Sequence, residues 1–106
     1  MEKQDNLLVE QKIVSVLKTV YDPEIPVNVW DLGLIYKLDI DEQMNCEVLM
    51  TLTAPNCPMA DALVDEVRET VAQLDELNQV TVKLTFDPPW FQDLMTEEAK
   101  LELGFL

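Results

Sequence analysis

The chain of 106 residues contains no histidine, two glycines, two cysteines and only seven basic residues. Without histidine a cysteine has no imidazole base, which excludes most hydrolytic mechanisms that use a thiol nucleophile. Gly33 and Gly104 are too few and too far apart for a glycine-rich phosphate-binding loop. Cys46 and Cys57 form no CxxC pair and have no zinc-ligand spacing. Metal or sulfur handling, redox exchange and a structural role remain for the cysteines.

Long apolar runs are also missing. No run approaches the roughly 18 residues of a membrane span, and residues 1–5 lack the apolar region of a signal peptide. We therefore expect a cytoplasmic protein with no membrane partner. The length predicts one domain over residues 1–106, and a reducing cytosol disfavours a disulfide between the two cysteines.

Basic residues are scarce beside acidic ones, with seven against 21 and a formal net charge of −14. Phosphate binding depends on lysine and arginine, so nucleic acid is not an expected partner. The acids are interpreted first as a source of solubility. The alternative is that they attract a basic partner or hard cations.

Apolar residues recur with helical or strand spacing along most of the chain. Helical spacing predicts helices over 5–21 and 58–74. Alternation predicts a hairpin over 34–52 and a third strand over 80–86, and Thr96 is the expected cap of a C-terminal helix. The order α-β-β-α-β-α predicts an α/β (α+β) fold, a single small domain with a three-stranded mixed sheet and helices packed mainly on one face. The strand order stays open.

Cys57 lies between the second predicted strand and the helix that follows it. Unpaired N–H groups and the positive end of the helix dipole favour a thiolate there. Asp61, one turn further on, opposes the thiolate by like-charge repulsion. The alternative is a small buried residue that packs a strand-to-helix turn. Cys46 falls on an apolar strand face and is expected in the core.

A loop with two prolines carries Asp22, Glu24, Asn28 and Asp31. Proline lowers the entropy lost on ordering, so this loop is a candidate binding edge. Asp31 is equally well explained as a turn residue that bonds its own backbone.

Two further motifs are interpreted as structural. Asp39 and Asp41 with Asn45 lack the central glycine and the distal glutamate of a calcium loop, so they predict a hairpin tip. Trp90 and Phe91 are interpreted as a hydrophobic plug and not as a ligand platform.

Three segments together resemble a known family. They are residues 22–36 (DPEIPVNVWDLGLIY), 51–58 (TLTAPNCP) and 87–104, which begins DPPW and continues MTEEAK and LG. Their order and spacing resemble the SufT/PaaD-like family of iron–sulfur cluster assembly proteins. The chain lacks the cysteine-rich C-terminal segment of PaaD-type members, so it is more similar to the short SufT-like form. Phe91 stands where the family often has a small polar residue.

The resemblance implies an α/β domain that helps to mature iron–sulfur proteins, with Cys57 at the position of the family's reactive cysteine. It also implies that Asp22, Glu24 and Asp31 line the same end of the sheet. Expected partners are iron–sulfur assembly proteins and client apoproteins.

The ligand count limits how such a protein would work. An iron–sulfur cluster normally takes four thiolates, and Cys57 alone does not supply them. A homodimer would bring two, with the rest from a partner, free thiols or carboxylates such as Asp22. Cys57 would then hold iron or a cluster only loosely, as a transient carrier with no tightly bound cofactor. In the adaptor version Cys57 engages a partner's cluster or thiol.

We therefore expect a non-enzymatic maturation factor. One alternative is a thiol-dependent redox enzyme, although no resolving cysteine lies nearby and Arg68 is three turns away. The other is an acidic protein-interaction module whose cysteine is structural.

Overall fold

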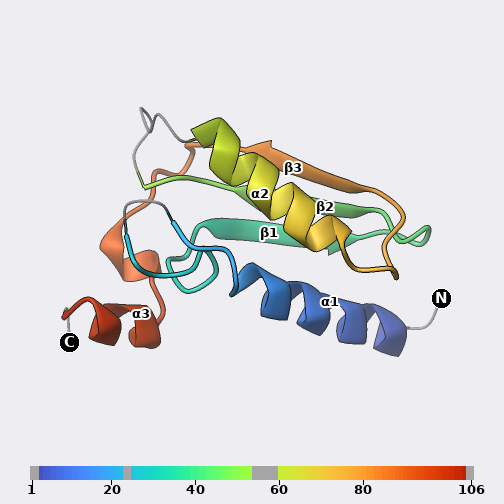
Figure 1. The fold of residues 1–106 in the computed structure, drawn as a ribbon, viewed down its shortest axis with the longest axis horizontal. Coiled ribbons are helices and arrows are strands. Elements are labelled where there is room, and N and C mark those ends of the chain that lie inside the picture. The colour runs from blue at the N-terminus through green and yellow to red at the C-terminus, as the bar shows by residue number, and fades with distance from the viewer. Residues whose placement is uncertain (1–2, 23–24, 54–59, 105–106) are drawn as a thin grey trace.

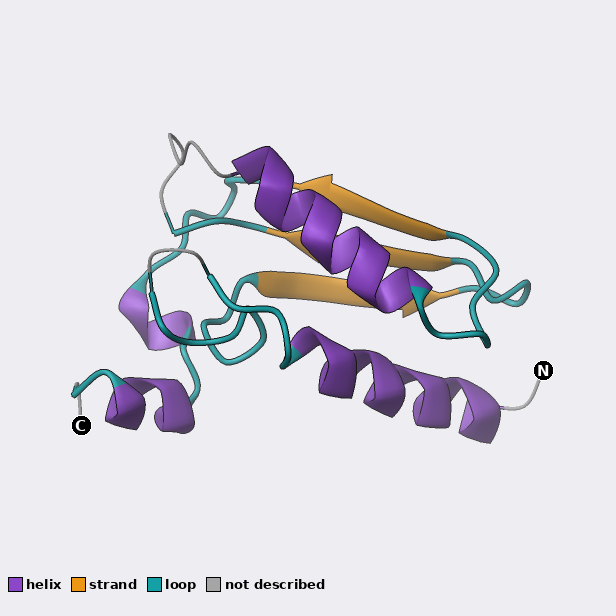
Figure 2. Ribbon diagram, in the orientation of Figure 1, coloured by secondary structure: helices purple, strands orange, loops and turns teal. Residues whose placement is uncertain are grey.

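The computed structural model describes residues 3–22, 25–53 and 60–104. Its elements are α1 (Lys3–Leu17), β1 (Ile35–Ile40), β2 (Cys46–Met50), α2 (Ala60–Ala72), β3 (Val80–Leu84), the 3-10 helix η1 (Gln92–Leu94) and α3 (Glu97–Glu102) (Figure 2). The predicted order and fold class are confirmed, and η1 is an addition to them. No helix in these ranges is long and apolar enough to cross a membrane.

The sheet has the order β1-β2-β3, with β2 in the centre. β1 pairs with β2 antiparallel, and β2 pairs with β3 parallel through the crossover helix α2. The carboxyl ends of β2 and β3 and the amino end of β1 therefore lie at the same end of the sheet (Figure 1). We call this the loop end.

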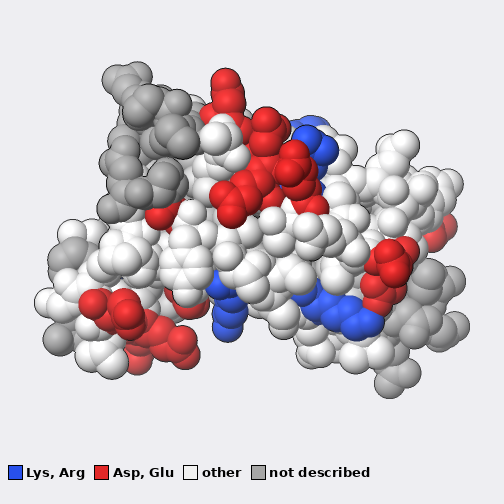
Figure 3. Space-filling view, in the orientation of Figure 1, with Lys and Arg blue, Asp and Glu red and all other residues white. Residues whose placement is uncertain are grey.

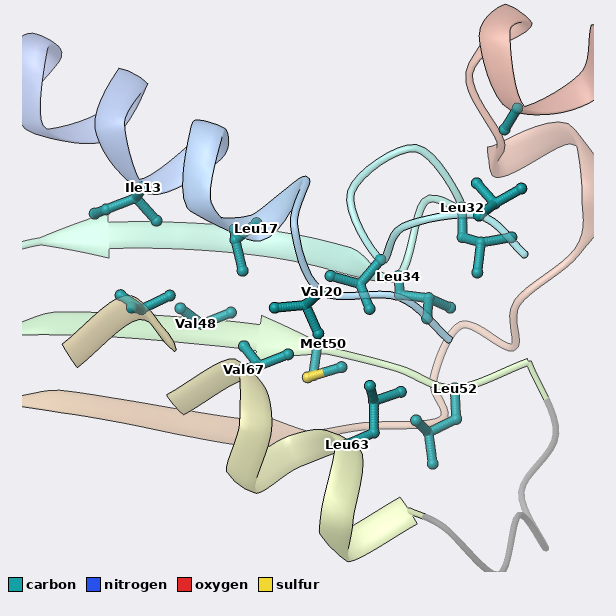
Figure 4. Close-up of a cluster of buried hydrophobic side chains, with 14 of the residues drawn as sticks. Ile13, Leu17, Val20, Leu32, Leu34, Val48, Met50, Leu52, Leu63 and Val67 are labelled. Carbon is teal, nitrogen blue, oxygen red and sulfur yellow. The ribbon is translucent and has the colours of Figure 1, made fainter. Parts of the chain in front are cut away.

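Both long helices pack on one face of the sheet, as expected (Figure 1). The side chains between them are buried, and Figure 4 shows several pointing toward one another from α1, α2 and β2. These core residues include Ile13, Leu17, Val48, Met50, Leu63, Val67 and Val71.

The other face of the sheet is polar. Successive strand residues point to opposite faces, so the residues that alternate with buried Val48 and Met50 face away from the helices. On this face Lys83 pairs with Glu47 at 3.0 Å, and Lys37 pairs with Asp39 at 3.4 Å. These exposed ion pairs keep the uncovered face solvated.

The first helix ends at Leu17, four residues before the predicted end. Thr19 and Val20 donate to carbonyls three residues back, which is a tightened last turn. Tyr21 then forms an antiparallel bridge with Asn28. Val20 is buried, as its apolar spacing predicts, but the pairing of Tyr21 with Asn28, seven positions away, replaces helical hydrogen bonding there.

The first strand departs from simple alternation. A bulge between Ile35 and Lys37 places Ile35 opposite Met50 and against the core. The predicted face of Leu34, Tyr36, Leu38 and Ile40 is therefore wrong at Tyr36. Its hydroxyl instead donates to the Pro88 carbonyl at 2.8 Å.

The third strand ends at Leu84 and not at residue 86. Leu84 and Phe86 remain 39% and 40% exposed, because β3 is an edge strand with one strand neighbour. At the C-terminus the predicted cap is confirmed, since the Thr96 hydroxyl accepts from the Ala99 N–H at 3.2 Å.

Gly33 is the most constrained glycine. It has φ +79°, and a Cβ there would lie 2.2 Å from the Leu94 carbonyl oxygen. We expect Gly33→Ala to lower the free energy of unfolding by at least about 2 kcal/mol, measured by urea denaturation.

Gly104→Ala is the matched control. Gly104 has φ +81°, and among the described residues no atom lies within 4 Å of the added Cβ, so only the backbone effect of about 1 kcal/mol is expected. Equal losses of free energy of unfolding in the two variants would show that the close approach of Leu94 to Gly33 does not destabilise Gly33→Ala.

Candidate functional site

The three segments that carry the family resemblance meet at the loop end. The Thr51 N–H donates to the Leu34 carbonyl at 2.8 Å, which joins the first segment to the second. The Thr85 N–H donates to the Met50 carbonyl at 2.9 Å just before the third segment begins. Of the second segment, residues 51–53 are described. Segments far apart in the sequence thus form one surface.

The loop between α1 and β1, which we call the acidic loop, is held in shape by side chains that hydrogen-bond to its own backbone. Asp22 is 8% exposed, and its Oδ1 accepts from the Ile25 N–H at 3.1 Å. Asn28 is 9% exposed; its Oδ1 accepts from the Asp31 N–H at 2.8 Å, and its Nδ2 donates to Asp31 Oδ2 at 2.9 Å. The turn bond expected of Asp31 is therefore made by Asn28, and the Asp31 carboxylate is half-buried and oriented.

A hollow of about 220 Å³ lies between this loop and α3. Buried Val27 and Ala99 give it an apolar lining, and Asp31, Glu98 and Glu102 contribute three carboxylates. These three acids take part in none of the ion pairs found in the described ranges. Figure 3 shows acidic side chains gathered over α3 and over α2. The hollow is therefore a negatively charged surface.

The predicted site residues fall into three groups. Asp31 lines the hollow, while Asp22, nine positions earlier in the chain, is buried and does not line it. Glu24 and Cys57 lie outside the described residues. The described residues that flank Cys57 are Thr53 after β2 and Ala60 at the start of α2, and Asp61 in the first turn of α2 is exposed.

Glu98 and Glu102 were not predicted as site residues. Their spacing of four places them on one side of α3, and this was the signal available in the sequence.

Cys46 is confirmed as a core residue. It is 2% exposed, and burial, followed by the negative charge of Asp39, raises the pKa of its thiol to about 11. The thiol is therefore protonated at neutral pH, and the protonated form neither binds metals nor attacks electrophiles well.

Of the motifs interpreted as structural, the hairpin tip and Trp90 are confirmed, whereas the interpretation of Phe91 as part of the plug is wrong because its side chain is 52% exposed. Asp41 caps the hairpin tip, where its Oδ1 accepts from the backbone N–H groups of Gln43 and Asn45 at 2.9 Å. Trp90 packs against the core as a plug, and its Nε1–H donates to the Leu32 carbonyl at 2.6 Å.

The fold and the hollow define a small α/β domain with an acidic, loop-built surface at one end. Residues 10–84 match the family described as iron-sulfur cluster assembly protein. The chain belongs to this family, and the resemblance found in its three segments is confirmed.

Two relatives match it over nearly their full length. A "Fe-S protein maturation auxiliary factor" of Porphyromonas gingivalis is 55% identical, over 94% of this chain and 95% of that protein. The "Fe-S protein maturation auxiliary factor YitW" of Bacillus subtilis is 40% identical, over 90% and 93%. The crystal structure of a domain of unknown function from Bacillus anthracis superposes with a TM-score of 0.86 at 35% identity, covering 93% of this chain and 94% of that one.

The high pKa of Cys46 predicts a loss of stability in alkali. The folded value of about 11 lies above the ordinary 9.0, so the protonated thiol stabilises the folded state fully below pH 9. This contribution is lost as pH rises from about 9 to about 11. Relative to Cys46→Val, wild type should lose free energy of unfolding across this range in urea titrations. A difference between the two proteins that does not change with pH would contradict the burial of this thiol.

Proposed function

We propose that this protein is a non-enzymatic maturation factor for iron–sulfur proteins, acting as a transient carrier or adaptor through Cys57 in the cytoplasm. The observation that carries the proposal is its family membership, together with a maturation factor of almost the same length at 55% identity. Iron or the cluster is then cargo that passes through the protein, and no tightly bound group is expected.

The chemistry of the two cysteines supports a cluster site whose ligands come from more than one molecule. A cluster normally takes four thiolates, and Cys46 is protonated and buried. One chain therefore offers Cys57 alone, and the other ligands come from a partner, a second copy or small thiols. Asp22 is a weaker candidate ligand than the sequence suggested, because its carboxylate is buried and holds the Ile25 N–H.

The same facts weigh against the redox alternative. A thiol-dependent redox enzyme that forms an internal disulfide needs a resolving thiol, and the other cysteine is 2% exposed. In the sequence Cys57 precedes Ala60, where α2 begins, by three residues. A position near a helix N-terminus would favour a thiolate.

The acidic surface suits a protein partner. Asp31 in the hollow, with Asp22 and Glu24 in the same loop, is proposed to contact iron–sulfur assembly proteins and client apoproteins. Charge complementarity favours a basic patch on those partners. A homodimer is an alternative way to place two Cys57 thiols together.

The test is maturation in cells that lack the native gene. We expect Cys57→Ser to leave the activity of an iron–sulfur client enzyme at the level of the gene-deleted cells. Cys46→Val is the matched control, and it should restore activity because that thiol packs in the core. Full activity with Cys57→Ser, at equal protein abundance, would reject the proposal.

A further inference from the structure

The C-terminal segment, residues 86–104, follows residues 10–84 in the chain and contacts the acidic loop at several points. The Thr96 N–H donates to the Asp31 carbonyl at 2.9 Å, on a residue that lines the hollow. The Leu94 backbone packs against Gly33, with no room for a Cβ between them.

Trp90 provides the contact that a single substitution can test. Its Nε1–H donates to the Leu32 carbonyl at 2.6 Å, and Leu32 is fully buried. No other donor to this carbonyl is found in residues 3–22, 25–53 and 60–104. Without the indole N–H this buried acceptor would be left unpaired, which opposes the closed position of the loop.

The same segment contributes Glu98 and Glu102 to the hollow beside Asp31. The C-terminal segment therefore both contacts the acidic loop and contributes residues to the hollow beside that loop. A loop held in its bound shape before a partner arrives loses less conformational freedom on binding.

We propose that Trp90 is a positioning residue and that the C-terminal segment acts as a clasp. The clasp holds residues 28–36, from the end of the acidic loop to the start of β1, in the geometry that binds partners. This inference rests on the proposed function, because it takes the loop to be a partner-binding surface. It assigns a role to Trp90 and to the C-terminal segment.

The experiment compares full-length wild type with Trp90→Phe, which keeps an aromatic ring and removes the N–H donor. Hydrogen–deuterium exchange, followed by mass spectrometry, should be about tenfold faster in residues 28–36. Exchange in α1 and α2 should be unchanged. Client activity in gene-deleted cells should fall at least threefold at equal protein abundance.

Val9→Ala is the matched control, because Val9 is a buried residue of α1 and belongs neither to the loop nor to the C-terminal segment. It should leave client activity near wild type and exchange in residues 28–36 slow. Unchanged exchange in Trp90→Phe, or activity no lower than in Val9→Ala, would overturn the clasp.

A second variant covers the case in which Trp90→Phe does not fold. Tyr36→Phe removes the exposed hydrogen bond to Pro88 from the same clasp, and should speed exchange of the loop about threefold. An unchanged exchange rate in that variant also counts against the proposal. The exchange measurement does not depend on Cys57, so the clasp and the proposed function fail separately.

Discussion

The parallel pairing of β2 with β3 determines where the candidate functional groups lie. The register runs from Cys46 opposite Val80 to Met50 opposite Leu84, so both strands leave the sheet at one end. A parallel pair requires a crossover, and here α2 supplies it on the face that α1 also covers. The linker that contains Cys57 therefore departs from the end where the acidic loop enters β1. The C-terminal segment starts at the same end and closes over that loop.

Two kinds of environment follow from this arrangement. Inside the sheet–helix layer the surroundings are apolar, and they keep Cys46 protonated and unavailable. At the loop end the chain exposes carboxylates around a hollow whose walls come from the loop and α3. A chain with two cysteines, one of them buried, and with a negatively charged surface suits brief contact with basic partners. It does not suit permanent storage of a cluster, which normally needs four thiolates.

Much of the fold could be predicted because the local patterns are strong. The stripe of Leu63, Val67 and Val71 and the alternation of Cys46, Val48 and Met50 are buried as expected. Features that depend on distant contacts were not predicted: the bulge at β1, the early end of α1 and the edge position of β3. The hollow is of the same kind, because Asp31 and Glu98 are 67 positions apart and meet only when the C-terminal segment docks. The spacing of residues within one helix or strand gives no information on contacts between distant segments.

The most direct test of the account is anaerobic reconstitution with iron and sulfide, followed by a challenge with excess EDTA. Iron content and visible absorption would be measured for wild type and for Cys57→Ser. The account predicts that wild type, with no partner protein present, retains no cluster after the chelator. It also predicts that any iron that wild type binds before the chelator is added is absent from Cys57→Ser. A cluster that survives the chelator in wild type, or that forms in Cys57→Ser, would contradict a shared, transient site at Cys57.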